Sequence, residues 1–163
     1  MQTSRRLFLF GAAGAAALVG APLAFAAADP YATSPFRQVS DGDWRRRLSP
    51  VSYDVLRREG TETPFTSPLN DEHRKGVFAC IGCGLPLFRS DWKFDSHTGW
   101  PSFFTAIDGA LGRKSDRKLL FEERTEYHCA QCLGHQGHVF PDGPRPTGLR
   151  YCNNGVALKF IPA

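Results

Sequence analysis

The chain has 163 residues and a mass of 18.0 kDa, the size of one domain with or without a tail. Hydrophobic residues make up 42% and charged residues 22%, a globular composition that excludes a disordered chain or a fibre. The net charge is +4, and two of the positive charges, Arg5 and Arg6, lie in the first 28 residues, so charge alone does not support a nucleic-acid-coating protein.

Residues 1–28 are typical of an export signal. Arg5 and Arg6 form a twin-arginine pair, and an apolar stretch rich in Ala and Gly follows them. Its low hydrophobicity and small-residue exit favour a cleaved signal over a retained membrane anchor, with cleavage after Ala26 or Ala28. By resemblance to other twin-arginine signals, the protein crosses the membrane already folded. The expected destination is the bacterial periplasm, which is oxidising.

Residues 29–163 are expected to form one domain. The polar, proline-containing stretch 29–48 is expected to wrap the surface. Ser49 and Pro50 then predict the start of a short helix, because Ser is a good N-cap and Pro suits the first helical position. The helix is expected to end at Gly60.

Beyond this helix the patterns indicate short strands. Alternating or continuous apolar residues predict strands at 76–79, 85–88, 118–128 and 154–161. The stretch 140–149 is rich in Pro and Gly and is expected to be a loop. The sequence therefore predicts a mainly β fold with one or two short helices at the start.

Four of the five cysteines form two C-x-x-C pairs separated by 45 residues, Cys80 with Cys83 and Cys129 with Cys132. Four thiolates are the ligand set of a structural zinc site, in which the protein fills every position of one Zn²⁺. The alternatives are two disulfides or redox-active pairs. Two pairs in one small chain, together with folded export, favour the metal.

The fifth cysteine, Cys152, is left over. A lone cysteine is more often a buried small hydrophobe than a nucleophile. His135 and His138 follow the second cysteine pair closely, and a cysteine with histidines and an amide nearby has the parts for nucleophilic catalysis. The alternative is that the two histidines are ordinary loop residues or auxiliary metal ligands.

Several sequence blocks carry a resemblance to a known family. They are Gly-Trp-Pro-Ser-Phe at 99–103, Gly-His-Val-Phe-Pro-Asp-Gly at 137–143, Arg-Tyr-Cys-Asn-Asn at 150–154 and the segment 61–65. These blocks resemble the methionine-(R)-sulfoxide reductase B family over nearly the whole mature chain. The resemblance implies two small antiparallel sheets with short N-terminal helices and a four-cysteine zinc site, as in Mss4-like folds. It also implies an oxidoreductase that repairs proteins after oxidative stress.

The resemblance also assigns candidate roles to six residues, which are Cys152, His135, His138, Asn154, Trp100 and Phe140. Cys152 matches the catalytic nucleophile, and Trp100 matches the aromatic residue that receives the methyl group of the substrate. Phe140 is a second candidate for substrate binding. The histidines and Asn154 match the remaining catalytic residues, which would protonate the sulfoxide oxygen or place the proton donor.

The implied reaction reduces the R epimer of methionine sulfoxide, free or in proteins, and leaves Cys152 as a sulfenic acid. Many family members carry a resolving cysteine where this chain has Thr98. An external thiol, from a thioredoxin-like protein or a small molecule, is therefore expected to complete the cycle. The protein is expected to act as a monomer without nucleic acid. The alternative is a non-catalytic zinc-knuckle binding module or metal chaperone, which would leave Cys152, His138 and Asn154 without a task.

Overall fold

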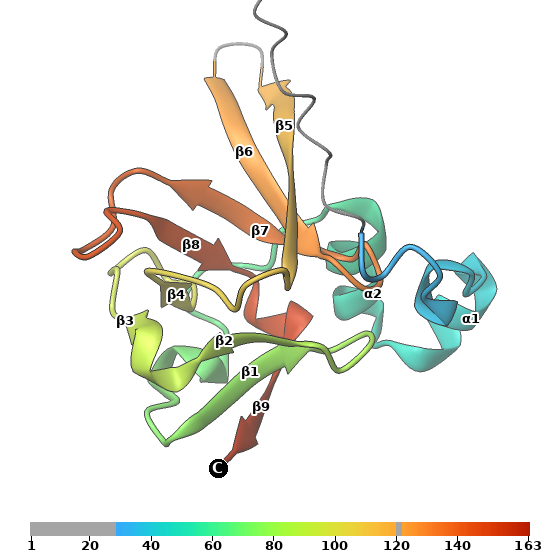
Figure 1. The fold of residues 1–163 in the computed structure, drawn as a ribbon, viewed down its shortest axis with the longest axis horizontal. Coiled ribbons are helices and arrows are strands. Elements are labelled where there is room, and N and C mark those ends of the chain that lie inside the picture. Colours follow the sequence, from blue (N-terminus) through green and yellow to red (C-terminus); the bar gives the residue numbers. More distant parts are fainter. Residues whose placement is uncertain (1–28, 120–121) are drawn as a thin grey trace, which may run out of the picture.

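The computed structural model describes residues 29–119 and 122–163 (Figure 1). The expected export signal, the twin-arginine pair included, lies outside these described residues. Within them, no helix combines the length and the apolar character needed to cross a membrane.

The described chain contains short helices followed by nine strands. The helices are α1 (Asp41–Arg47) and α2 (Pro50–Arg58), with 3-10 turns η1 (Pro35–Arg37), η2 (Pro68–Asp71), η3 (Ser90–Trp92) and η4 (Gly155–Ala157). The strands are β1 (Gly76–Cys80), β2 (Pro86–Arg89), β3 (Lys93–Phe94), β4 (Ser102–Phe103), β5 (Leu111–Leu119), β6 (Glu122–Cys129), β7 (His135–Phe140), β8 (Arg150–Asn153) and β9 (Leu158–Pro162).

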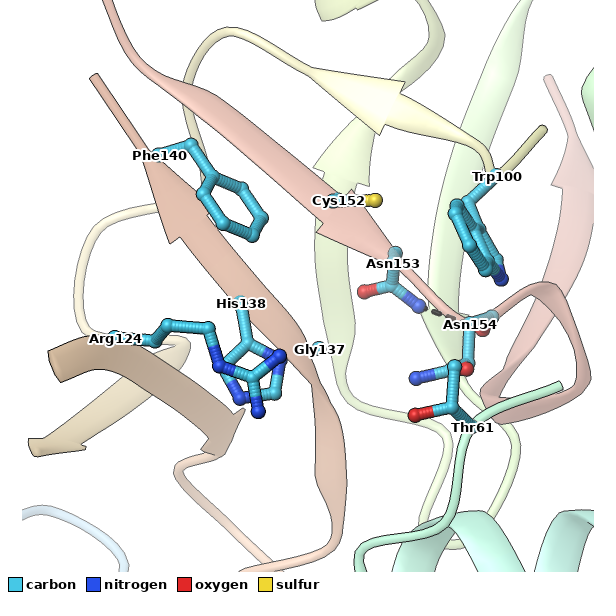
Figure 2. Close-up of a pocket in the computed structure, with 9 residues that line it drawn as sticks. All are labelled: Thr61, Trp100, Arg124, Gly137, His138, Phe140, Cys152, Asn153 and Asn154. Carbon is cyan, nitrogen blue, oxygen red and sulfur yellow. Dashed lines mark hydrogen bonds between the residues drawn. The ribbon is translucent and has the colours of Figure 1, made fainter. Parts of the chain in front are cut away.

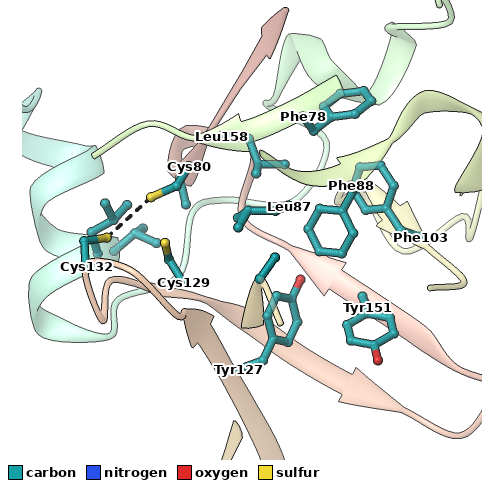
Figure 3. Packing of buried hydrophobic residues seen from close by; sticks show 14 of the residues in the cluster. Phe78, Cys80, Leu87, Phe88, Phe103, Tyr127, Cys129, Cys132, Tyr151 and Leu158 are labelled. Carbon is teal, nitrogen blue, oxygen red and sulfur yellow. Dashed lines mark hydrogen bonds between the residues drawn. The ribbon is translucent and has the colours of Figure 1, made fainter. Parts of the chain in front are cut away.

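These strands form two antiparallel sheets, which confirms the predicted fold class. One sheet has three strands in the order β2-β1-β9, and the other has six in the order β3-β4-β8-β7-β6-β5. In Figure 1 the helices α1 and α2 lie together to one side of the strands. Aromatic side chains from both sheets fill the core between them (Figure 3), with the Phe88 ring of β2 stacked on the Phe103 ring of β4 at 4.2 Å.

Helix α2 begins as predicted. The Ser49 hydroxyl accepts a hydrogen bond from the Ser52 backbone N–H at 3.1 Å, and Pro50 occupies the first turn. The last helical residue is Arg58, and Glu59 follows in the left-handed conformation at φ 57°. The helix therefore ends two residues before Gly60, the residue at which the sequence predicted its end.

Residues 29–48 lie mostly at the surface, as expected, but they also contribute a helix and a core residue. Seven of them form α1, which Ser40 caps by accepting from the Asp43 N–H. Trp44 projects from this helix into the core and is 1% exposed. The other side chains of α1 are mostly charged, so the polar composition of this helix gave no indication that Trp44 would be buried.

Two strand predictions need correction. The expected strand 118–128 consists of the ends of two antiparallel strands, because β5 ends at Leu119 and β6 begins at Glu122. The segment expected to be a strand from 154 begins instead with η4, and β9 starts only at Leu158. The short pairing of β3 with β4 was not anticipated. The strands expected at 76–79 and 85–88 are present, displaced by no more than one residue.

The loop expected at 140–149 is confirmed in substance, and it has a positional consequence. It connects β7 to β8, which pair antiparallel in the six-stranded sheet. Their register places His138 directly opposite Cys152. Residues opposite each other in such a ladder point to the same face with Cβ atoms about 4.5–5.5 Å apart.

Candidate active site and metal centre

The four cysteines of the two C-x-x-C pairs form one cluster. Figure 3 shows three of them, Cys80, Cys129 and Cys132, at one end of the core. The sulfur atoms of all four lie within 4.8 Å of one another, with 3.6 Å between Cys80 and Cys132 and 3.4 Å between Cys83 and Cys129. A tetrahedron of sulfur ligands around a metal at about 2.3 Å has edges of about 3.8 Å. All four are free thiols that are buried or half-buried, so the cluster is able to hold one metal ion.

The two C-x-x-C pairs share one backbone design. In each, the residue four positions after the first cysteine has a left-handed backbone, Gly84 at φ 81° and Leu133 at φ 60°. In each, that residue donates its N–H to the carbonyl oxygen of the first cysteine at 2.9 Å. Leu133 therefore adopts a left-handed conformation that is strained for leucine and carries no steric cost for glycine.

Helix α2 packs on both cysteine pairs. Leu56 is 2% exposed. Its Cδ2 methyl lies 2.9 Å from the place that a Cβ on Gly82 would occupy, and 3.1 Å from the place that a Cβ on Gly134 would occupy. Arg57 of the same helix donates to the Cys132 carbonyl oxygen at 3.1 Å. Glycine at both positions leaves room for this close approach, so α2 covers the cysteine cluster.

A pocket of about 140 Å³ opens beside Cys152 (Figure 2). Nine residues line it, which are Thr61, Trp100, Arg124, Gly137, His138, Phe140, Cys152, Asn153 and Asn154. Five of the six residues singled out from the sequence are among them. In Figure 2, Trp100 and Asn154 lie on one side of Cys152, and His138 and Phe140 lie on the other.

The sixth, His135, does not line this pocket. It is 3% exposed, and its Nδ1 lies 2.7 Å from a carboxylate oxygen of the buried Glu126. Its ring lies 5.4 Å from that of His138, centroid to centroid. His135 therefore lies behind His138, buried against Glu126 and outside the pocket lining.

The Cys152 thiol is half-buried, and burial raises its pKa. The Arg150 guanidinium and the hydroxyls of Thr98 and Ser102 oppose this rise, because they stabilise the thiolate. The Oγ1 of Thr98 lies 4.0 Å from the Cys152 sulfur. The position at which many family members carry a resolving cysteine is therefore in contact with Cys152.

His138 is held by a pair of charged residues from the neighbouring strands. Its Nε2 lies 2.8 Å from a carboxylate oxygen of Asp116, and Arg124 donates to the same oxygen at 2.8 Å. Burial lowers the pKa of His138, and the hydrogen bond to Asp116 opposes the shift. A carboxylate only accepts, so Nε2 carries the hydrogen and Nδ1 of the neutral ring is an acceptor.

Glu62 joins the two residues on the other side of the pocket, and sequence reasoning missed it. Its backbone N–H donates to Asn154 Oδ1 at 3.0 Å, and its carbonyl oxygen accepts from the Trp100 indole at 3.2 Å. Its carboxylate accepts the backbone N–H groups of Gly155 and Val156. Glu62 is 5% exposed, and burial raises its pKa despite these hydrogen bonds.

Sequence reasoning also missed four residues that line the pocket, which are Thr61, Arg124, Gly137 and Asn153. Two of them, Thr61 and Arg124, gave no local signal of a shared site. Thr61 comes from an irregular segment, while Arg124 comes from β6. Gly137 and Asn153 are immediate neighbours of His138 and Cys152, and adjacency to those two residues was the one usable signal. The pairing of β6, β7 and β8 brings Arg124, Gly137 and Asn153 together, and the irregular segment that holds Thr61 completes the lining.

Comparison with known proteins gives a consistent result. The family model described as the SelR domain matches residues 48–162. The peptide methionine sulfoxide reductase MsrB of Agrobacterium fabrum is 51% identical over 131 residues, which is 80% of this chain and 96% of that protein. MsrB of Thiobacillus denitrificans is 50% identical over 123 residues, 76% of this chain and 93% of that protein.

A plant protein and a solved structure also match. Peptide methionine sulfoxide reductase B1, chloroplastic, of Arabidopsis thaliana is 47% identical over 76% of this chain and 61% of that protein. The crystal structure of the Mis18 'Yippee-like' domain is 17% identical with a TM-score of 0.45, and the match covers 55% of this chain and 98% of that one.

Proposed function

The chain belongs to the SelR-domain family of MsrB peptide methionine sulfoxide reductases, and we propose that its reaction, the reduction of methionine sulfoxide, takes place in the pocket around Cys152. The observation that carries this assignment is the register of β7 and β8, which sets His138 opposite Cys152 in that pocket. A non-catalytic binding module or metal chaperone explains the four clustered cysteines and does not explain this pairing.

The proposed first step transfers one oxygen atom. The sulfur of Cys152 attacks the sulfoxide sulfur, the sulfur–oxygen bond of the substrate breaks, and the oxygen ends on Cys152 as a sulfenic acid. The thiol proton moves to that oxygen, so thiol and sulfoxide become sulfenic acid and thioether with no other reactant. His138 is suited to carry this proton, because its Nδ1 accepts and Asp116 stabilises the resulting imidazolium.

The opposite side of the pocket is proposed to orient the substrate. Trp100 offers an apolar surface for the methyl group, and Phe140 borders the pocket across from it (Figure 2). Asn154 uses one Nδ2 hydrogen on the Gln136 carbonyl oxygen at 2.9 Å, which leaves the second available to the sulfoxide oxygen. A fixed methyl site and a fixed oxygen site together select one sulfur epimer, which by family resemblance is R.

Turnover of separated epimers tests the assignment. N-acetylmethionine (R)-sulfoxide and its S epimer are each incubated with dithiothreitol and either wild-type protein or Cys152→Ser. We expect turnover of the R epimer by the wild type and loss of more than a thousandfold in the variant, which should retain its metal and its melting temperature. Equal turnover by the two proteins would place the chemistry elsewhere.

The metal is proposed to be Zn²⁺ with a structural role. Four cysteine thiolates in a tetrahedral arrangement suit Zn²⁺, and the protein fills all four positions. Bound Zn²⁺ would keep the four cysteines as ligated thiolates and so shield them from oxidation. Elemental analysis of purified protein should find one zinc per chain. Four oxidised cysteines without metal would instead indicate disulfides.

Export is a separate proposal that rests on the sequence alone. Arg5 and Arg6 are proposed to direct the folded precursor to the periplasm through the twin-arginine machinery, followed by cleavage after Ala26 or Ala28. Replacing both arginines by lysine should leave full-length protein in the cytoplasm, as judged by fractionation. Normal export of that variant would indicate the route that handles unfolded chains.

A further inference from the structure

Phe65 is a large apolar side chain held outside the core. It is 72% exposed, and its backbone has φ 65°, in the left-handed region that phenylalanine rarely adopts. Such a conformation is strained for a residue with a Cβ and persists only where the surroundings impose it. An exposed aromatic residue in a strained conformation requires an explanation.

The surroundings that impose it belong to the segment that precedes Trp100. The Phe65 N–H donates to the Gly99 carbonyl oxygen at 2.7 Å, and Asn70 Nδ2 donates to the same oxygen at 3.1 Å. A Cβ on Gly99 would lie 2.8 Å from Phe65 Cδ2, from Phe65 N and from Pro64 Cβ. Gly99 itself has φ 91°. Phe65 is therefore seated directly on the residue before Trp100.

A groove of about 260 Å³ lies at this seat. Its lining includes Phe65, Asn70, Lys93, Phe94, Asp95 and Trp100. Trp100 also lines the pocket of Cys152, so one indole separates the two spaces. A peptide whose methionine sulfoxide side chain enters the pocket and whose backbone continues past Trp100 reaches the groove, because Trp100 lines both spaces.

We propose that Phe65 and this groove bind the polypeptide flanking methionine sulfoxide in an oxidised protein, with the Phe65 ring packing on an apolar side chain next to the oxidised methionine. This inference rests on the proposed function and adds a subsite to it. The occupant is apolar because Phe65 is the exposed large apolar side chain of the lining, whereas Phe94 and Trp100 are half-buried. The charges in the lining, among them Lys93 and Asp95, are of both signs and favour neither acidic nor basic flanks.

The test compares three substrates. These are N-acetylmethionine (R)-sulfoxide and two blocked tripeptides with the same oxidised residue at the centre, flanked by glycine in one and by leucine in the other. Phe65→Asn removes the ring with a residue that tolerates the left-handed conformation. Phe65→Leu keeps an apolar side chain. Val51→Asn, at an exposed position of α2 away from the pocket, is the matched control.

In the wild type we expect kcat/KM for the leucine-flanked peptide to exceed that for the glycine-flanked one by about fivefold to tenfold, as for one buried apolar contact. Phe65→Asn should abolish this preference and leave turnover of the N-acetyl derivative within twofold. Phe65→Leu should keep most of the preference, and Val51→Asn all of it.

Three outcomes would overturn the inference: an unchanged preference in Phe65→Asn, an equal loss on all three substrates, or a dimer that dissociates on this substitution in sedimentation. The last would assign Phe65 to an interface with a second copy. Failure of the wild type on every sulfoxide would instead refute the proposed function.

Discussion

At the scale of single residues, the surroundings of Cys152 determine how much of its sulfur is thiolate, the form that would act as the nucleophile. Burial raises the pKa of the thiol, so at neutral pH the thiolate fraction is smaller than for a free cysteine. At neutral pH Cys152 is therefore mainly a protonated thiol, which reacts with electrophiles more slowly than a thiolate does. Its proton is then available for the sulfoxide oxygen, with His138 opposite it in the sheet.

Alkylation by iodoacetamide tests this state. Because only the thiolate reacts, the rate at Cys152 should rise with pH and reach half its maximum above the pH found for glutathione in the same mixture. At pH 7 the rate should be below that of glutathione. Peptide mass spectrometry separates Cys152 from the four clustered cysteines. A rate at pH 7 above that of glutathione would show that Arg150 outweighs burial.

Glu62 is a positioning residue whose replacement should change epimer selectivity. Glu62→Gln puts an amide NH₂ where the carboxylate accepts the N–H groups of Gly155 and Val156. Loss of a buried charged acceptor should lower the free energy of unfolding by about 1–3 kcal/mol. Trp100 and Asn154, which both bond to the Glu62 backbone, should then be less fixed relative to each other, and the R over S ratio of kcat/KM should fall.

Asp91→Asn is the control for this substitution, because Asp91 is exposed and forms only a surface ion pair with Arg89. It should change the unfolding free energy by less than about 1 kcal/mol and leave the R over S ratio of kcat/KM unchanged. If Glu62→Gln lowers stability at an unchanged epimer ratio, the role of Glu62 is limited to holding the fold.

At the scale of elements, the two cysteine pairs are matched turns that differ at one position. Gly84 occupies the left-handed position of the first, and Leu133, 47% exposed, occupies that of the second. Leu133→Gly should relieve the left-handed strain and raise the unfolding free energy by about 1 kcal/mol in urea with metal present. Gly84→Leu should lower it by a similar amount. A destabilised Leu133→Gly would show that the side chain makes a contact worth more than the strain.

The pairing of β7 with β8 shows how an element creates the site. The loop of residues 141–149 returns the chain so that His138 and Cys152 share one register position. A shift of one residue would turn one of the two side chains to the opposite face. The chemistry of the pocket therefore depends on a register that is set by the whole six-stranded sheet.

At the scale of the whole molecule, the five cysteines divide into a cluster of four and Cys152. Thr98 contacts Cys152 and cannot form a disulfide. After one equivalent of sulfoxide without reductant, we expect dimedone to label Cys152 as a sulfenic acid while the metal stays bound. An external thiol should then form a mixed disulfide with Cys152.

The matched variant for this experiment is Thr98→Cys, which restores a thiol at the position in contact with Cys152. It should convert the sulfenic acid into an internal disulfide and abolish the dimedone adduct. In the wild type, a disulfide between Cys152 and one of the four clustered cysteines, with release of metal, would contradict a purely structural metal site.

The sequence allowed some of these features to be predicted because their signals are local. Ser49 and Pro50 mark the start of α2, and the spacing of the four cysteines indicates a tetrahedral ligand set, whatever the surrounding fold. Trp44 and Glu62 could not be placed in the same way. Each is one residue in a polar segment, and its burial follows from contacts with parts of the chain that are distant in sequence.

The sequence by itself determined the chemical inventory of this protein: a fifth cysteine with two histidines nearby, four cysteines at metal-ligand spacing, and the resemblance to one family. Only the tertiary structure decided which of them act together. It placed His138 on the pocket and His135 behind it, joined Asp116 to His138, tied Trp100 to Asn154 through Glu62, and seated Phe65 on Gly99. The physical reason is that residue type and spacing act over a few bonds, whereas burial, strand register and close approach are settled by the packing of the whole chain.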